Sequence, residues 1–184
     1  GRVNVDGGNV RTSTTDSITW ATVNVKNGEV IAEDGIAVGD HSTVNVMGGT
    51  VTGTTYGVYG DNSSVNVSAG LLSAPIAADV SSAKVTGGKV IGSEYAIIAT
   101  NTNIGGGEVT SPKNAIVTTN LTMSDGKVDS TSEVGITINS TGTITGGEIY
   151  GGTYGVYSKD TLTLRTNDSE ISSTSPMLEG ELLG

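Results

Sequence analysis

A sequence motif of alternating apolar and polar residues, followed by glycine turns, recurs along the chain about every twenty residues. Its two clearest copies are VNVMGGTVTGTTYGVY at 44–59 and GTITGGEIYGGTYGVY at 142–157. Alignment on the glycine turn gives nine units of 18–21 residues, which begin at Val3, Val23, Val44, Val65, Ala83, Thr102, Leu121, Gly142 and Leu162. A fixed period of this length is typical of a solenoid, in which each repeat is buried only by its neighbours.

The residue types within the units favour strands over helices. Val, Ile and Thr dominate, and Gly interrupts them at short intervals. The chain contains 28 Gly but only 3 Pro, and Gly does not fall at every third position, so collagen is excluded. A leucine-rich repeat needs its own Leu and Asn ladder, which is missing. The recurring aliphatic residues also argue against disorder.

Each unit contains three short strands by this interpretation. The first alternates as in Val44-Asn45-Val46, with its apolar residues facing inward. The second centres on one inward residue, at Val10, Val30, Val51, Leu72, Val90, Val109, Val128, Ile149 and Ile171. The third centres on another, at Ile18, Ile36, Val58, Ile76, Ile97, Ile116, Ile136, Val156 and Met177. Because parallel crossovers are almost always right-handed, the sequence predicts an all-β, right-handed parallel β-helix.

The predicted β-helix is a single domain over residues 1–184. Regular coils span 3–161, and 162–184 form an atypical last coil followed by a C-terminal plug. We expect Met177, Leu178, Leu182 and Leu183 to fold back over that end. The first coil has no such cover, so we expect it to be capped either by residues that precede this sequence or by self-association with a second copy. Glycine pairs such as Gly48-Gly49 should turn the corner between the first two strands, with positive φ at Gly49.

The phrases at 44–60 and 142–158 resemble the right-handed β-helix repeats of bacterial secreted and cell-surface proteins. These include carbohydrate-binding β-helix modules, adhesins and autotransporter-like passengers. The resemblance covers nearly the whole chain and implies a secreted or cell-surface protein that binds or adheres. The net charge of −10 argues against nucleic-acid binding, and no apolar run reaches the roughly 18 residues of a membrane span.

Two outward columns are predicted to stabilise the stack rather than to bind. Asn4, Asn24, Asn45, Asn66 and Asn103 occupy the middle of the first strand, with Lys84 and then threonines in the remaining units. Stacked amides can hydrogen-bond along the axis. Lys89, Glu108, Lys127 and Glu148 alternate in charge over four consecutive units, which places opposite charges side by side.

The outward face of the third strand is the candidate ligand or partner surface. It reads Thr19, Ala37, Tyr59, Ala77, Ile98, Val117, Thr137, Tyr157 and Leu178, which is unusually apolar for an exposed face. Sugar rings stack on exposed aromatics, and partner proteins bury apolar patches. The predicted contact residues are Trp20, Tyr59, Ile98, Val117 and Tyr157. The simpler alternative is that strands favour such residues in any case.

Asp40, Asp61 and Asp79 each precede the next unit by four residues. Stacked carboxylates would repel one another, and Ca²⁺ with its oxygen ligands would relieve the repulsion. The alternative is that Asp is simply a preferred turn residue. We expect no other cofactor, because the lone His41 has no His or Cys partner for a zinc site.

The predicted function is therefore a non-enzymatic binding or adhesion module that contacts carbohydrate or a partner surface. One alternative is a polysaccharide lyase or hydrolase, since such enzymes also use β-helices. Against an enzyme, the units are uniform in length, so no long loops are available to form the sides of a cleft. No cluster of acidic residues is predicted next to an Arg either. A further alternative is a structural stalk within a longer repeat protein.

Overall fold

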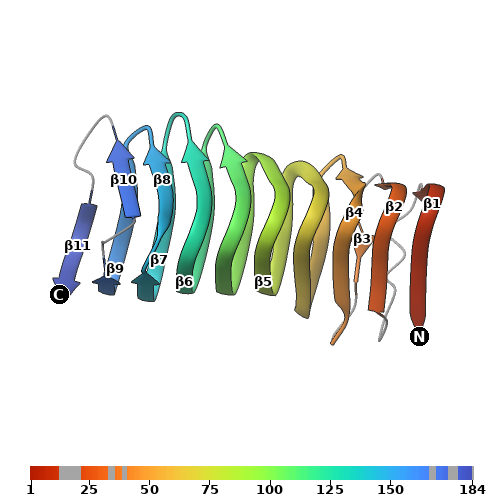
Figure 1. The fold of residues 1–184 in the computed structure, drawn as a ribbon, viewed down its shortest axis with the longest axis horizontal. Helices are drawn as coiled ribbons and strands as arrows, with labels where there is room; N and C mark the ends of the chain where they lie inside the picture. Colours follow the sequence, from red (N-terminus) through yellow and green to blue (C-terminus); the bar gives the residue numbers. More distant parts are fainter. Residues whose placement is uncertain (13–21, 33–35, 39–40, 166–168, 174–177, 184) are drawn as a thin grey trace.

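The computed structural model describes residues 1–12, 22–32, 36–38, 41–165, 169–173 and 178–183. Every regular element within these ranges is a strand (Figure 1). The strands are β1 (Arg2–Thr12), β2 (Thr22–Ala32), β3 (Ile36–Ala37), β4 (Thr43–Gly53), β5 (Tyr56–Ser111), β6 (Asn114–Ser130), β7 (Val134–Ile144), β8 (Gly147–Gly151), β9 (Tyr154–Leu164), β10 (Ser169–Ser173) and β11 (Leu178–Leu183). No helix that could span a membrane occurs in the described ranges.

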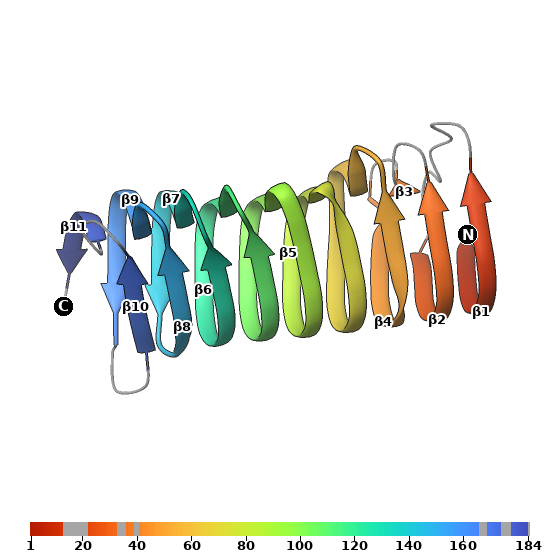
Figure 2. The same ribbon diagram turned by 90° about the horizontal axis from the view of Figure 1, so that it is seen from above.

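All strand pairs are parallel, and each strand pairs with the one that lies about twenty residues further on. The central order is β1-β2-β4-β5-β6-β7-β9-β11, while β6, β8 and β10 pair along a second side. Figures 1 and 2 show the result as a row of stacked coils. β5 is long because it winds through successive coils without interruption. The predicted all-β parallel β-helix is confirmed.

The described residues make about seven turns, against the nine units expected. The first, second and ninth units include residues outside the described ranges, namely 13–21, 33–35, 39–40, 166–168 and 174–177. The unit boundaries themselves are confirmed where separate strands pair. Val3 lies beside Val23, Val23 beside Val44, and Val44 beside Val65. Further on, Leu121 lies beside Gly142, which lies beside Leu162.

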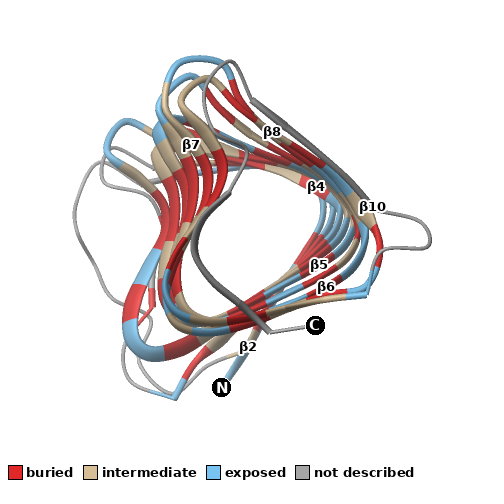
Figure 3. Ribbon diagram, turned by 90° about the vertical axis from the view of Figure 1, so that its left-hand side faces the viewer, coloured by how far each residue is buried: buried red, intermediate tan, exposed pale blue. Residues whose placement is uncertain are grey.

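The core is a set of aliphatic columns that run along the stack. Viewed along the axis, the coils superimpose on a three-sided outline with buried positions on every side (Figure 3). Val44, Val51 and Val58, one from each side of one coil, have no exposed surface. At the first coil the same columns open to solvent: Val3 and Val10 are 38% and 41% exposed, whereas Val23 and Val30 are 2% and 5% exposed. Burial therefore depends on neighbouring coils.

The third strand of the fourth unit differs from the prediction. Ile76 was expected to face inward, but it is only half-buried, and Ala77 and Ala78 are fully buried. They match the buried pairs of other coils, such as Gly57-Val58 and Ala96-Ile97. The large Leu72 occupies the core nearby, since its Cδ1 lies 2.7 Å from where a Cβ on Gly57 would be. Small alanines therefore face inward, because the core volume is already filled.

The glycine turns have the expected conformation with one exception. Gly28, Gly70, Gly88, Gly107, Gly126 and Gly147 have positive φ, between 70° and 97°. Gly49 does not, so the expected strain of a side chain in the left-handed region is wrong at this residue. Glycine is needed there for another reason: an added Cβ would lie 2.5 Å from the Gly28 carbonyl oxygen of the previous coil.

The C-terminal segment ends in β11, whose backbone pairs with β9. In β11, Leu178 lies beside Val156 and Leu182 beside Leu162, in parallel with β9. Met177 and the side chains of Leu178, Leu182 and Leu183 lie outside what the structure describes, so the plug stays a prediction.

Candidate functional site

Five of the six tyrosines lie in two columns that border the third side of the coil. The first column contains Tyr56, Tyr95 and Tyr154, and the second contains Tyr59 and Tyr157. Between the columns runs the buried pair of each coil, such as Gly57-Val58. We call this surface the tyrosine face; it comprises Tyr56, Tyr59, Tyr95, Ile98, Val117, Tyr154 and Tyr157.

The tyrosines at each end of the face form pairs across the two columns. The rings of Tyr56 and Tyr59 lie 4.8 Å apart at 40°, and those of Tyr154 and Tyr157 lie 6.0 Å apart at 41°. Both pairs come from the same TYGVY phrase, which places its tyrosines on either side of the inward Gly-Val. Tyr59 is 40% exposed. Aromatic pairs of this geometry are mutually stabilising and hold both rings in place.

The structure brings four of the five predicted contact residues into one column. Ile98 lies beside Val117, Val117 beside Thr137, and Thr137 beside Tyr157. Tyr59 continues the column at the other end, beside Ala37. All four predicted side chains are at least partly exposed. Trp20, the fifth, lies outside the described residues.

Asp79 belongs to the same column, at the position expected for Ala77. It follows the buried Ala77-Ala78 pair just as Tyr59 follows Gly57-Val58. Burial raises the pKa of the Asp79 carboxyl above its ordinary value, and the nearby charge of Asp61 raises it further. Asp79 therefore borders the tyrosine face, in the column of Tyr59 and Ile98, and lies close enough to Asp61 to feel its charge.

The structure describes two of the three aspartates that were predicted to bind Ca²⁺. Asp61 is exposed at the corner after the third strand, Asp79 lies on the strand, and Asp40 falls outside the described residues. Within the described part of the chain, no three His, Cys, Asp or Glu side chains are grouped in a way that could hold a metal ion.

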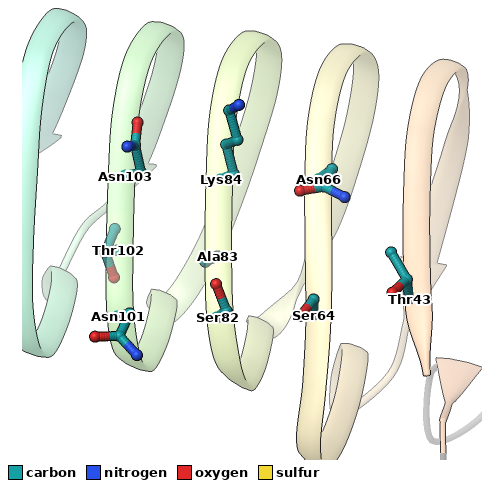
Figure 4. A pocket seen from close by; sticks show the side chains of 9 residues that line it. All are labelled: Thr43, Ser64, Asn66, Ser82, Ala83, Lys84, Asn101, Thr102 and Asn103. Carbon is teal, nitrogen blue, oxygen red and sulfur yellow. The ribbon is translucent and has the colours of Figure 1, made fainter. Parts of the chain in front are cut away.

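A groove that the sequence did not predict lies on the adjoining first-strand side. It encloses about 370 Å³ and is lined by Thr43, Ser64, Asn66, Ser82, Ala83, Lys84, Asn101, Thr102 and Asn103 (Figure 4). We call this site the polar groove. Every lining side chain except Ala83 carries a hydrogen-bonding group, and none is acidic.

The polar groove arises where the corner between coils becomes shorter. Four residues, 61–64, connect the buried Gly60 to Val65, but only Ser81 and Ser82 connect the buried Val80 to Ala83. The chain therefore projects less at Ser82 than in the preceding coil, which leaves a step on the surface. The unit that starts at Val65 is the shortest, with 18 residues, and this was the available signal in the sequence.

The asparagine ladder has the expected contacts from Asn4 to Asn66, whereas the charged column has one of its three expected ion pairs among the described residues. Asn24, Asn45 and Asn66 each donate from Nδ2 to the Oδ1 of the previous asparagine, over 2.8 Å in every case. In the charged column, Lys89 Nζ lies 2.7 Å from Glu108 Oε2, and Glu108 lies beside Lys127. Lys127 pairs with Asp129 instead, with Nζ 3.4 Å from Oδ2. The hydrogen bond from Lys89 lowers the pKa of Glu108, and the charges of both lysines lower it further.

Comparison of the chain with protein-family models, curated proteins and solved structures finds no match.

Proposed function

We propose that the chain is a non-enzymatic binding module of a secreted or cell-surface protein, and that its tyrosine face contacts carbohydrate. The observation that carries the proposal is the concentration of five tyrosines on one side of a chain that is only 4% aromatic. An exposed aromatic ring offers a flat apolar surface on which the C–H face of a sugar ring can stack.

The geometry of the face suits an extended ligand better than a small one. Tyr59 and Tyr157 are five coils apart, which corresponds to about 24 Å at the spacing of parallel strands. Between them lie Ile98 and Val117, which are partly exposed and apolar. A polysaccharide chain that runs along the stack would meet an aromatic pair at each end and an aliphatic surface in between.

A glycan array probed with the purified chain tests the proposal, followed by titration with the best glycan. Tyr59→Ala and Tyr157→Ala should each weaken binding by about tenfold, as expected for the loss of one stacked ring. Tyr150→Ala is the matched control, because Tyr150 is the one tyrosine outside the two columns. No binding to any glycan would overturn the proposal, and so would equal losses in all three variants.

A partner protein could bury the same face instead of a glycan. The face would then serve adhesion between surfaces, and its apolar residues would be the interface core. Loss of cell or matrix attachment in the Tyr59→Ala variant, with an empty glycan array, would identify this role.

One observation favours an enzyme as the second candidate. Asp79, whose pKa burial raises, and its neighbour Asp61 are two carboxyl groups in unequal environments, as the two carboxyl groups of a glycoside hydrolase are. Release of reducing ends from polysaccharides, abolished in Asp79→Asn, would establish hydrolysis. Intact polysaccharides after long incubation would leave binding as the function.

A further inference from the structure

Two amide ladders end at the polar groove, one from each direction. The first runs from Asn4 to Asn66, and each Nδ2 donates toward the N-terminal side. The second comprises Asn101, Asn120 and Thr141: Asn120 Nδ2 donates to Asn101 Oδ1 over 3.0 Å, and Thr141 Oγ1 donates to Asn120 Oδ1 over 2.8 Å. In both ladders each donor points toward the preceding coil. The first ladder therefore ends with an acceptor at Asn66, and the second begins with a donor at Asn101.

The end of each ladder leaves one hydrogen-bonding group without a protein partner in the described part of the chain. Asn66 Oδ1 is an acceptor that no following amide reaches, because Lys84 occupies the next coil. Asn101 Nδ2 is a donor, and the preceding coil offers Ser82 in place of an amide. Figure 4 shows the Asn66 oxygen and the Asn101 nitrogen on the sides that face the coil of Lys84. The polar groove thus presents an acceptor and a donor across a single coil.

Lys84 adds a positive charge on the coil between these two groups, and its ammonium lies toward the opposite end of the groove from Asn101 (Figure 4). It stands where the column of Asn45 and Asn66 would place another amide, and its side chain is exposed. Lys89, Lys113 and Lys127 each have a carboxylate oxygen within 4 Å, whereas no described carboxylate approaches Lys84 this closely. An unpaired ammonium in a groove without acids is available to an anionic ligand.

We propose that the polar groove binds a carboxylate-bearing sugar unit of an acidic polysaccharide. The assignment rests on the proposed function and gives the ligand its chemical class. Lys84 Nζ pairs with the sugar carboxylate, Asn66 Oδ1 accepts a hydrogen bond from a sugar hydroxyl, and Asn101 Nδ2 donates to a sugar oxygen.

Three features favour this ligand over others. A neutral sugar would use the two amide groups but leave the ammonium unpaired. A nucleic acid would need several cations along its phosphates, and Lys84 is the only basic residue that lines the groove in a chain of net charge −10. The groove extends across several coils at about 4.8 Å each, which is close to the length of one sugar unit in an extended polymer.

The experiment compares polygalacturonate with its fully methyl-esterified form, which keeps the sugar backbone and removes the charge. Calorimetric titration of the wild-type chain should show tighter binding of the acidic polymer, weakened by added salt. Lys84→Gln should reduce that affinity about tenfold, the effect of losing one charge-assisted hydrogen bond, and leave the esterified polymer unaffected. Lys84→Arg should largely restore it. Lys159→Gln is the control, because Lys159 is an exposed lysine outside the groove.

The outcomes separate this inference from the proposed function. Equal affinity for both polymers, or equal losses in Lys84→Gln and Lys159→Gln, would overturn the carboxylate assignment and leave carbohydrate binding intact. Equally tight binding of a sulfated polymer would show that charge alone is recognised, which also overturns it. Failure to bind these polymers or any glycan of the array would overturn both.

Discussion

Asp79 is a half-buried carboxylic acid in the column that also contains Tyr59, Ile98 and Val117. Its raised pKa means that burial and Asp61 disfavour the ionised form in the folded protein. Between the ordinary value of 3.8 and the raised value, the folded protein binds more protons than the unfolded chain. Stability should therefore fall as the pH rises through that window.

Asp79→Asn tests this directly. The variant should unfold at a higher temperature than wild type at neutral pH, because it removes a carboxylate that is charged and partly desolvated. The difference should shrink as the pH falls to about 3, where the carboxyl of wild type is also neutral. Asp61→Asn should lower the Asp79 pKa only in part, since burial is the larger cause. A variant less stable than wild type at neutral pH would show that the ionised carboxylate is stabilised.

Glu108→Lys tests the charged ladder. The new lysine would face Lys89 and Lys127 on both sides, and the expected loss is about 1 kcal/mol. Glu29→Lys makes the same change in the same column, but its paired neighbours are Asn9 and Thr50. Urea denaturation at low and high salt measures both variants. Equal stability of the two variants at low salt would contradict the role given to neighbouring charge.

At the scale of the element, the glycine turns keep adjacent coils in contact. A Cβ on Gly49 would lie 2.5 Å from Gly28 O and 2.8 Å from Val25 Cγ1. We expect Gly49→Ala to cost about 1–3 kcal/mol, as overpacking usually does. Gly105→Ala is the control, since the nearest atom to its Cβ would be 3.8 Å away. Thermal denaturation compares the two variants, and a Gly49→Ala variant as stable as Gly105→Ala would show that the corner relaxes without cost.

The columns of the coil could be predicted because a strand alternates strictly and the unit length is nearly constant. Val44, Val51 and their equivalents are fixed by counting from the glycine turn. The third strand of the fourth unit could not be predicted in the same way. Ile76 was assigned to the core because it is larger than the alanines that follow it, but Leu72 already fills the core there. That error also hid the place of Asp79 in the tyrosine face.

The polar groove depends on information that a repeat alignment removes. It forms because corner lengths differ between neighbouring coils, and because Lys84 replaces an amide between two ladders. An alignment treats both features as imperfections of the repeat. The tyrosine face was only partly predicted, since Tyr56, Tyr95 and Tyr154 belong to a column that borders the far side of the buried pair.

At the scale of the whole molecule, the edge of β1 leaves one row of backbone groups without a partner strand in the described structure. In the described structure β1 pairs only with β2, and Val3 and Val10 lie open beside its unpaired edge. We expect self-association through this edge, seen as a sedimentation coefficient that rises with protein concentration. Val3→Lys together with Val10→Lys should abolish the rise, because charged side chains at an edge oppose pairing. Concentration-independent sedimentation of the wild type would contradict the expectation.

The uniform pairing distance has a consequence for how the chain folds. Each coil docks on a neighbour about twenty residues away, so the loop that must close is the same size at every step. The entropy of closing that loop does not grow as coils are added, and relative contact order falls with length. Once two coils have paired, further coils can add at either end, as in other one-dimensional repeat proteins. Removing one whole unit should therefore change the folding rate much less than removing half of one.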